Sequence, residues 1–232
     1  MVLIDWQALQ GSIGINFKDE ALLQQAFIHS SYVNENPDFP TADNERLEFL
    51  GDALLSFMVA EELYHQFANA GEGDLTEIRI SLVRQETLAE CAARLKLGDY
   101  LFLGKGEEAT GGREKQTNLA DALEALIGAI YLDHGLNVVR DFILAQFAGH
   151  IKTVKLKGIG RNYKAQLQEF SQAKYNQLPA YSIIEASGPD HDKSYIIEVR
   201  LGNRIWGIGS GKNKRAAEME AARSALEKLA TN

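Results

Sequence analysis

Acidic residues at helical spacing in an otherwise apolar segment are the strongest chemical signal in this sequence. The segment NERLEFLGDALLSFMVA (residues 44–60) contains Glu45, Glu48 and Asp52. Because successive residues of a helix turn by about 100°, these three side chains fall within an arc of about 60°. Leucine, phenylalanine, alanine and methionine occupy most of the remaining circumference. The pattern therefore predicts a mostly buried helix with a narrow acidic stripe.

A second apolar segment carries the same anomaly. In LADALEALIGAIYL (residues 119–132), Asp121 and Glu124 are the only charged residues, and they lie one turn apart on one face. Burying an unpaired carboxylate costs several kcal/mol, and like charges about 4 Å apart add about 4 kcal/mol per pair at an effective dielectric constant of about 20. Two such helices need something that offsets this cost.

Three explanations for the acidic stripes compete. Both stripes could face solvent, with the helices packed on their other sides. Basic residues elsewhere could neutralise the carboxylates, but residues 1–150 hold only 10 Lys and Arg against 24 Asp and Glu. Hard divalent cations could bind between them, because oxygen ligands without Cys or His suit Mg²⁺ or Mn²⁺ better than Zn²⁺. The occurrence of two such helices in one part of the chain favours the metal.

A carboxylate-bridged di-iron centre is the alternative metal chemistry. It needs two Glu-x-x-His motifs on bundle helices, whereas the sequence has one, Glu62 to His65. We expect His29, in FIHSSY, to be a structural hydrogen-bonding residue. The glycine-rich segment GKGEEATGG (104–112) lacks the GKS or GKT ending of a phosphate-binding loop, so it is expected to be a solvent loop.

The pattern of apolar residues divides the chain into two parts. Helical spacing recurs through most of residues 1–150, with polar or glycine-rich breaks. After the basic segment KTVKLKGIGR (152–161), the pattern changes to a helix, three short alternating strands and a helix. Residues 151–232 hold 14 Lys and Arg against 8 Asp and Glu. This basic part suits a polyanion, whereas the acidic part repels one unless cations intervene.

The sequence also predicts a cytoplasmic protein with no membrane partner. No apolar run approaches the roughly 18 residues that a membrane-spanning helix needs, and the N-terminal segment lacks the basic start of a signal peptide. The single cysteine, Cys91, lies in the apolar pattern LAECAARL and is expected to be a buried, inert thiol.

The two acidic segments resemble the motifs of a known family. NERLEFLGD (residues 44–52) closely resembles the nine-residue motif that marks ribonuclease III, and NLADALEALIGAIYLD resembles that family's second acidic helix. The C-terminal part resembles a double-stranded RNA-binding domain in length and in its order of elements. The resemblance covers nearly the whole chain. It implies an all-α endonuclease domain at 1–151, a linker at 152–160 and a small α+β (α-β-β-β-α) double-stranded RNA-binding domain at 161–232.

The resemblance also implies roles for individual residues. The family's metal ligands fall on Glu45, Glu48, Asp52, Asp121 and Glu124. Glu45 anchors metal at the edge of the site, whereas Asp52 and Glu124 act in catalysis, with Glu124 closest to the Mg²⁺ ions. Mn²⁺ is expected to substitute for Mg²⁺. Phe49 matches an aromatic residue that fills a pocket on a second subunit, which implies a homodimer.

For the C-terminal domain, the resemblance implies three regions of contact with RNA. The first helix contributes Lys164, Gln166 and Glu169. The turn between the first two strands contributes Gly188, Pro189, Asp190 and His191. The start of the last helix, where backbone amides also favour a phosphate, contributes Lys212, Lys214 and Arg215. One departure is Glu218, which stands where many such domains have lysine and is expected to reduce the affinity.

Together these features predict an endoribonuclease that hydrolyses double-stranded RNA with Mg²⁺. The resemblance implies products with 5′-phosphate and 3′-hydroxyl ends and short 3′ overhangs, and a role in processing ribosomal RNA precursors and structured transcripts. The alternative is a non-cleaving, double-stranded RNA-binding regulatory dimer. The complete set of acidic residues argues against it, because a protein that does not cut RNA has no reason to keep them buried.

Overall fold

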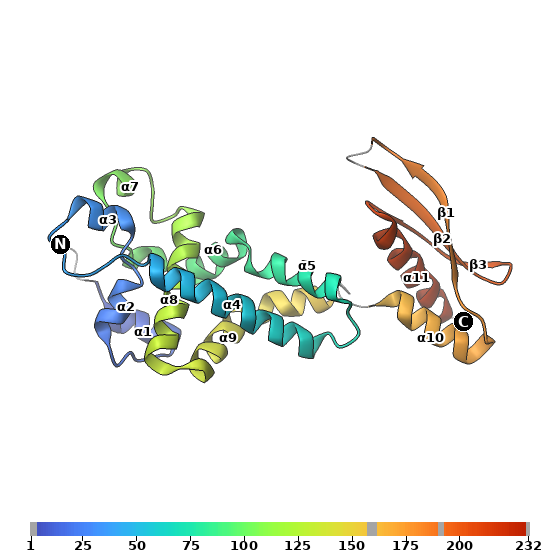
Figure 1. Cartoon of the computed structure of the whole chain (residues 1–232), viewed down its shortest axis with the longest axis horizontal. Coiled ribbons are helices and arrows are strands. Elements are labelled where there is room, and N and C mark those ends of the chain that lie inside the picture. The colour runs from blue at the N-terminus through green and yellow to red at the C-terminus, as the bar shows by residue number, and fades with distance from the viewer. Residues whose placement is uncertain (1–3, 157–161, 190–192, 231–232) are drawn as a thin grey trace. The chain divides into compact units, whose positions relative to one another are not determined.

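The chain forms two compact units, an all-helical one followed by an α+β one, as predicted (Figure 1). The computed structural model describes residues 4–156, 162–189 and 193–230. The first unit is Met1–Gly160 and the second is Arg161–Asn232.

Within its described residues the first unit is helical apart from an isolated β-bridge between Ile28 and Phe102. This agrees with the helical spacing of its apolar residues. Its elements are α1 (Trp6–Ile13), α2 (Glu20–Gln25), α3 (Ser30–Glu35), α4 (Glu45–Gln66), α5 (Glu72–Val83), α6 (Gln85–Arg94), the 3-10 helix η1 (Leu97–Tyr100), α7 (Lys105–Ala109), α8 (Gln116–His134) and α9 (Leu136–Leu156).

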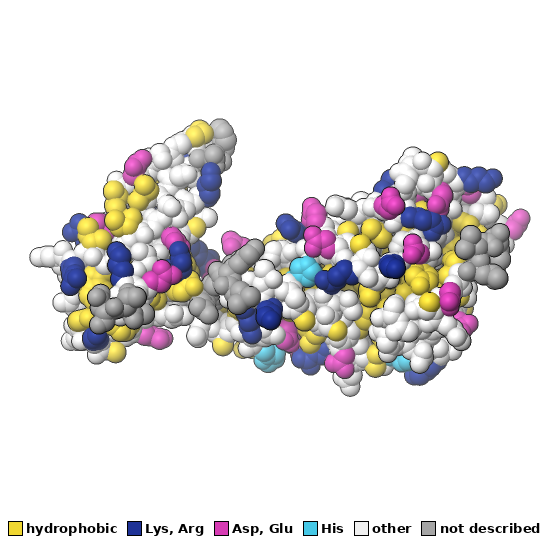
Figure 2. Space-filling model, turned by 180° about the vertical axis from the view of Figure 1, so that it is seen from behind, with side chains coloured by type: hydrophobic (Ala, Val, Ile, Leu, Met, Phe, Trp, Pro, Cys, Tyr) yellow, Lys and Arg dark blue, Asp and Glu magenta, His cyan; other side chains and the backbone are white. Residues whose placement is uncertain are grey.

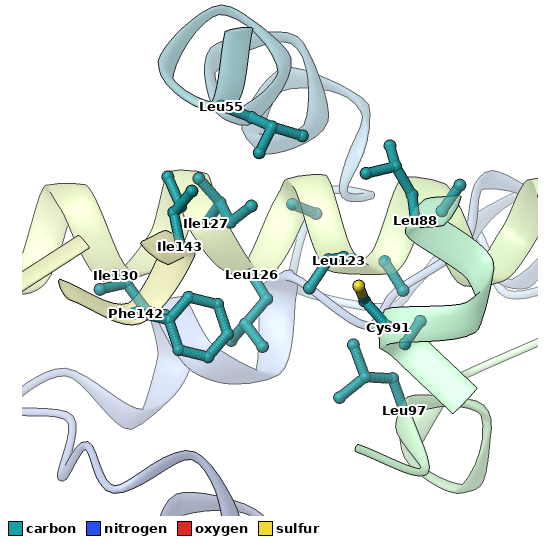
Figure 3. Packing of buried hydrophobic residues seen from close by; sticks show 14 of the residues in the cluster. Leu55, Leu88, Cys91, Leu97, Leu123, Leu126, Ile127, Ile130, Phe142 and Ile143 are labelled. Carbon is teal, nitrogen blue, oxygen red and sulfur yellow. The ribbon is translucent and has the colours of Figure 1, made fainter. Parts of the chain in front are cut away.

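Helix α8 is the centre of this unit. Its apolar side chains, such as Leu126 and Ile127, are fully buried. α4, α6 and α9 pack around it, and Figure 3 shows Leu55, Leu88 and Phe142 of these three helices within the same cluster. The two acidic segments of the sequence therefore lie on adjacent helices, since they form most of α4 and most of α8.

Helices α4 and α8 cross at very short range through two glycines. A Cβ atom at Gly51 of α4 would collide with the carbonyl oxygen of Glu124, and one at Gly128 of α8 would collide with the carbonyl oxygen of Leu47. Glycine inside a helix is less favourable than alanine by about 1 kcal/mol. Here the missing side chains let the two backbones come into contact, and this contact brings the acidic faces of both helices together.

The C-terminal end of α9 differs from the linker expected at 152–160. The helix continues to Leu156, because Ile151 and Val154 are buried in the core of the first unit and hold its last turns in place. Residues 152–156 are thus helical, and 157–160 lie outside the described residues.

The second unit has two helices on one face of a three-stranded antiparallel sheet with the order β1-β2-β3. Its elements are α10 (Tyr163–Tyr175), β1 (Ala180–Ser187), β2 (Ser194–Leu201), β3 (Arg204–Gly211) and α11 (Lys214–Ala230). Leu167, Val199 and Ala221 are fully buried between the helices and the sheet. A side chain at Gly207 or Gly209 would collide with the backbone of α11, so these glycines set the close packing of that helix on β3.

Two expectations about the chain as a whole concern its cysteine and the membrane. Cys91 is fully buried, as predicted, and burial raises the pKa of its thiol. None of the helices in the described part of the chain combines the length and the apolar composition that a membrane span requires.

Candidate active site

Three carboxylates converge where α4 and α8 cross. Glu48 of α4 and Asp121 and Glu124 of α8 each offer one oxygen atom, and these atoms lie within 4.8 Å of one another. All three residues are half-buried. Among the described residues, no lysine or arginine forms an ion pair with any of them. A cluster of carboxylate oxygens without basic partners fits a hard cation such as Mg²⁺.

The other two predicted ligands, Glu45 and Asp52, are exposed on α4 and lie outside this group of three. Their charges still act on it. Burial and then the charge of Asp121 are the largest causes of the raised pKa of Glu48, and Glu45 and Asp52 raise it further. The five acidic residues therefore form one electrostatic cluster, with three half-buried members and two exposed ones.

The strongest electrostatic effect in the cluster falls on Glu124. Burial, followed by the charges of Asp52, Glu48 and Asp121, raises its pKa from the ordinary 4.5 to about 8. Burial also raises the pKa of Asp121, and the nearby imidazole of His29 opposes that effect. At neutral pH and without a cation, the carboxyl group of Glu124 therefore keeps its proton.

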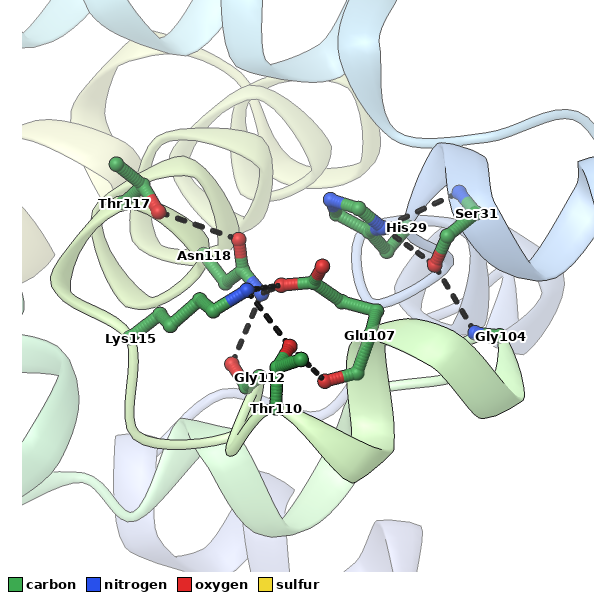
Figure 4. A network of polar contacts seen from close by, with 9 residues as sticks. All are labelled: His29, Ser31, Gly104, Glu107, Thr110, Gly112, Lys115, Thr117 and Asn118. Carbon is green, nitrogen blue, oxygen red and sulfur yellow. Dashed lines mark hydrogen bonds and ion pairs between the residues drawn. The ribbon is translucent and has the colours of Figure 1, made fainter.

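A polar network joins α8 to the segment that precedes it (Figure 4). Glu107 Oε1 accepts hydrogen bonds from Lys115 Nζ at 2.7 Å and from Asn118 Nδ2 at 2.8 Å. Asn118 Nδ2 also donates to the carbonyl oxygen of Gly112 at 2.9 Å. The hydrogen bonds from Lys115 and Asn118 lower the pKa of Glu107, which favours the ionised carboxylate that accepts them. Asn118 lies one turn before Asp121, so the network fixes the part of α8 that enters the cluster.

The segment 104–112 is mostly solvent-exposed, as its glycines predict, but part of it is a helix rather than a loop. Lys105–Ala109 form α7, and the carboxylate of Glu35 accepts hydrogen bonds from the backbone amides of Lys105 at 2.8 Å and Gly106 at 3.4 Å. The sequence does not predict this helix because the contacts that hold it join residues about 70 positions apart in the chain. Such long-range pairing leaves no periodic signal in the sequence.

In the second unit, the predicted RNA-contacting residues of α10 differ in their surroundings. Lys164 Nζ lies 2.5 Å from Glu218 Oε2 of α11 and 4.7 Å from the ring centroid of Tyr181. Its charge is thus paired within the domain. Gln166 is half-buried and Glu169 is exposed, so of the three predicted residues Glu169 is the most accessible.

The predicted contact residues near β1 and α11 lie at exposed positions where the structure describes them. Gly188 and Pro189 follow β1 and are exposed, whereas Asp190 and His191 lie outside the described residues. The basic residues at the start of α11 are all exposed, namely Lys212, Lys214 and Arg215. Basic side chains are unfavourable at a helix N-terminus, and a bound phosphate would remove that cost. Figure 2 shows several Lys and Arg side chains on one face of this unit.

Comparison with known proteins decides which family has this combination of units. Residues 19–151 match the Ribonuclease-III-like family, and residues 163–229 match the double-stranded RNA binding motif. The chain is 44% identical over 227 residues to Ribonuclease 3 of Dehalococcoides mccartyi, with 98% of this chain and 96% of that protein covered. It is 45% identical over 224 residues to Ribonuclease 3 of Bacillus cereus, with 97% and 91% covered.

The chain belongs to the ribonuclease III family. It is an endoribonuclease whose helical nuclease domain is followed by a double-stranded RNA-binding domain. A solved nuclease domain of ribonuclease III from Campylobacter jejuni is similar to it, with a TM-score of 0.58 and 41% identity over 62% of this chain and 97% of that one. The predicted family and the predicted enzyme class are therefore confirmed.

Sequence reasoning about this ribonuclease III found the acidic side chains but missed the residues that hold their helices. Gly51 and Gly128 appeared only as members of apolar segments, although an isolated glycine inside a helical pattern is a signal of close packing. Glu107 and Asn118 gave no comparable signal, because each is a single polar residue whose partner lies elsewhere in the chain.

The raised pKa of Glu124 predicts how stability depends on pH in the absence of metal. Between pH 4.5 and about 8 the native state holds a proton that the unfolded chain has lost, so the contribution of this group to stability falls as the pH rises. Glu124→Gln removes this pH-dependent loss of stability. It should raise the unfolding midpoint in EDTA at pH 8 by roughly 2–8 °C, which corresponds to about 1–2 kcal/mol, and have little effect at pH 5.

A matched control is Glu77→Gln, which neutralises an exposed carboxylate of α5 outside the cluster. Calorimetry of both variants at the two pH values separates a local effect from a change in net charge. Equal pH dependence in wild type and Glu124→Gln would show that the carboxyl group is not destabilised by its surroundings.

Proposed function

We propose that this enzyme cleaves both strands of double-stranded RNA by Mg²⁺-dependent hydrolysis at the carboxylate cluster of α4 and α8. The products are expected to carry 5′-phosphate and 3′-hydroxyl ends with short 3′ overhangs. The observation that carries this proposal is the convergence of Glu48, Asp121 and Glu124 within 4.8 Å of one another, half-buried and without a Lys or Arg partner among the described residues. Such an arrangement is unfavourable without a cation between the carboxylates.

In this proposal the five acidic residues have different roles. Glu48, Asp121 and Glu124 hold Mg²⁺, and the exposed Asp52 and Glu45 extend the cluster toward solvent, where RNA approaches. Bound Mg²⁺ supplies positive charge for the phosphate oxygens and lowers the pKa of water. Glu124 would give up its proton on binding a cation, because the positive charge would outweigh the burial and the neighbouring carboxylates that raise its pKa. Asp52 and Glu124 act in catalysis. Mn²⁺ is expected to support the same reaction.

The proposal is tested by cleavage of an end-labelled RNA duplex of about 30 base pairs, long enough for the roughly 16 base pairs that a domain of this type covers. Glu124→Gln should reduce the cleavage rate in Mg²⁺ at least 100-fold, because it removes one charged ligand of the cluster. Glu77→Gln should cleave like wild type. Binding of the duplex, measured in Ca²⁺, should be retained by both variants.

Two outcomes would contradict the proposed mechanism. Undiminished cleavage by Glu124→Gln would mean that the reaction occurs elsewhere. Binding without cleavage by the wild-type protein would instead match the non-cleaving regulatory dimer. In the cell we propose that the substrates are ribosomal RNA precursors and structured transcripts in the cytoplasm. The choice of substrates is supported by the double-stranded RNA-binding domain, because domains of this type bind with little sequence preference. The cytoplasmic location is supported by Cys91, a buried thiol without a disulfide partner.

The RNA-binding domain is proposed to contact the duplex through the start of α11, the β1–β2 turn and α10. Lys214 and Arg215 contact phosphates together with Lys212, and the turn contributes Gly188, Pro189 and His191. Helix α10 contributes Gln166 and Glu169, and also Lys164. The pairing of Lys164 with Glu218 limits its contribution, because the ammonium group must leave that carboxylate to reach RNA.

Glu218→Gln should therefore strengthen RNA binding by about 2–5-fold at low salt, because it frees Lys164 and removes a negative charge. Lys214→Ala should weaken binding and reduce the slope of log affinity against log salt by about 1. Fluorescence anisotropy with a labelled duplex in Ca²⁺ measures both effects. Glu185→Gln, which makes the same charge change on exposed β1, is the control. An equal gain in that variant would point to net charge alone.

We also propose that the enzyme is a homodimer that pairs through α4. Phe49, Phe57 and Tyr64 are 80%, 56% and 69% exposed, and their spacing keeps them within an arc of about 80° on that helix. A pocket of about 460 Å³ lies near the C-terminal end of α4, lined by α4 and α5. Antiparallel pairing of two α4 helices around a two-fold axis would bring Phe49 of each subunit toward that pocket of the other.

The dimer proposal predicts that Phe49→Ser weakens the association at least 10-fold, because one large aromatic anchor per subunit is lost from the interface. Light scattering after gel filtration at micromolar concentration should give twice the chain mass for wild type and about the chain mass for the variant. Leu132→Ser, which replaces another exposed apolar residue at 55% exposure on α8, should remain dimeric. A monomeric wild type would contradict the proposal.

A further inference from the structure

His29 occupies a fixed position between the start of α4 and the segment before α8. Its backbone amide donates to the carbonyl oxygen of Phe102 at 3.1 Å, and Phe102 in turn donates to the carbonyl oxygen of Phe27 at 2.8 Å. The neighbouring carbonyl of Ile28 accepts the backbone amide of Asn44, the residue before α4, at 2.8 Å. The backbone around His29 is therefore tied to the chain segments that lead into both acidic helices.

The imidazole of His29 has one nitrogen committed to α3. As the residue that caps α3, it accepts the backbone amide of Ser31 on Nδ1 at 3.2 Å, and Ser31 Oγ lies 2.8 Å from the same nitrogen. Ser31 Oγ also accepts the backbone amide of Gly104 at 2.9 Å, so its own hydrogen is available for Nδ1. Because Nδ1 accepts these hydrogen bonds, the neutral ring carries its hydrogen on Nε2.

The second nitrogen of the ring, Nε2, takes no part in the contacts with Ser31. In Figure 4, Nε2 points away from Ser31, and the ring lies beside the carboxylate of Glu107 and the amide of Asn118. Asp121 follows Asn118 by one turn on the same face of α8. Consistent with this placement, a charge on His29 lowers the pKa of both Asp121 and Glu107.

We propose that His29 is a positioning residue, whose Nε2–H orients the Asp121 carboxylate through one water and thereby sets the affinity of the cluster for divalent metal. Ser31 fixes the ring in the tautomer that this role requires. This inference rests on the proposed metal site. It goes beyond that site because it assigns metal affinity to an imidazole at the N-cap of α3 that is not itself a ligand. Groups that orient metal ligands typically change metal affinity by about 10–100-fold when they are removed.

The two nitrogens of His29 can be tested separately by two substitutions. His29→Asn keeps an oxygen acceptor near Nδ1, and asparagine is a favourable helix cap, but it removes the donor at Nε2. His29→Gln extends an amide donor toward the position of Nε2 but removes the acceptor near Nδ1. If the role of His29 is purely structural, loss of the cap should lower the affinity for metal. If His29 is a positioning residue, loss of the Nε2 donor should lower it.

The experiment measures Mn²⁺ binding to the metal-free full chain by electron paramagnetic resonance of free Mn²⁺, beside calorimetric unfolding of the same samples. His29→Asn should raise the dissociation constant for Mn²⁺ about 10-fold or more, with an unfolding midpoint within about 2 °C of wild type. His29→Gln should unfold at a lower temperature and keep its affinity within about 3-fold. For RNA cleavage, His29→Asn should keep its KM for the duplex and recover its rate at high Mg²⁺.

The outcomes separate this inference from the proposed function. If wild type binds Mn²⁺, Glu124→Gln does not, and His29→Asn binds within 2-fold of wild type, the positioning role is overturned while the metal site stands. Equal losses of affinity in both His29 variants, in step with lost stability, would also overturn it. If wild type binds no Mn²⁺ at millimolar concentration, the proposed metal site fails and the positioning role fails with it.

Discussion

The close crossing of α4 and α8 is the constraint on which the rest of the nuclease unit depends. Packed helices ordinarily lie about 8–10 Å apart, held off by their side chains. At Gly51 and Gly128 there is no room even for a methyl group, so the two backbones meet. This contact places Glu48 on one helix against Asp121 and Glu124 on the other, at a distance that a wider crossing could not reach. The geometry of the carboxylates follows from two missing side chains.

The close crossing of α4 and α8 lowers the stability of the metal-free protein. Two glycines inside helices and a set of half-buried carboxylates all oppose folding, and the pKa of Glu124 near 8 records the electrostatic part of this cost. A cation bound between the helices, as proposed, would turn this repulsion into attraction. Stability, metal affinity and pH would then be linked through the carboxyl group of Glu124. The basic second unit complements this arrangement, because residues 1–150 carry a large excess of acidic groups that would otherwise repel RNA.

The sequence predicts those parts of the structure that repeat along a helix or strand. Apolar spacing predicted α4 and α8, and the unusual Glu48, Asp52 and Glu124 within them led to the prediction of a metal site. The features that the sequence does not predict depend on contacts between residues that are far apart in the chain. Glu107 lies in a segment whose glycines predict a loop, and its hydrogen bonds to Lys115 and Asn118 leave no pattern in the sequence. The lysines at the end of α9 predict a linker, whereas the burial of Val154 keeps this segment helical.

The most direct test of this account is the affinity of the metal-free chain for Mn²⁺ in Gly51→Ala, compared with Gly149→Ala. Gly149 lies inside α9 with open space around it, so alanine there should stabilise the helix by about 0.5–1 kcal/mol and leave metal binding unchanged. Alanine at Gly51 must push the helices apart, which typically costs about 1–3 kcal/mol, and should weaken Mn²⁺ binding at least 10-fold. Wild-type affinity in a folded Gly51→Ala protein would contradict the claim that the crossing builds the site.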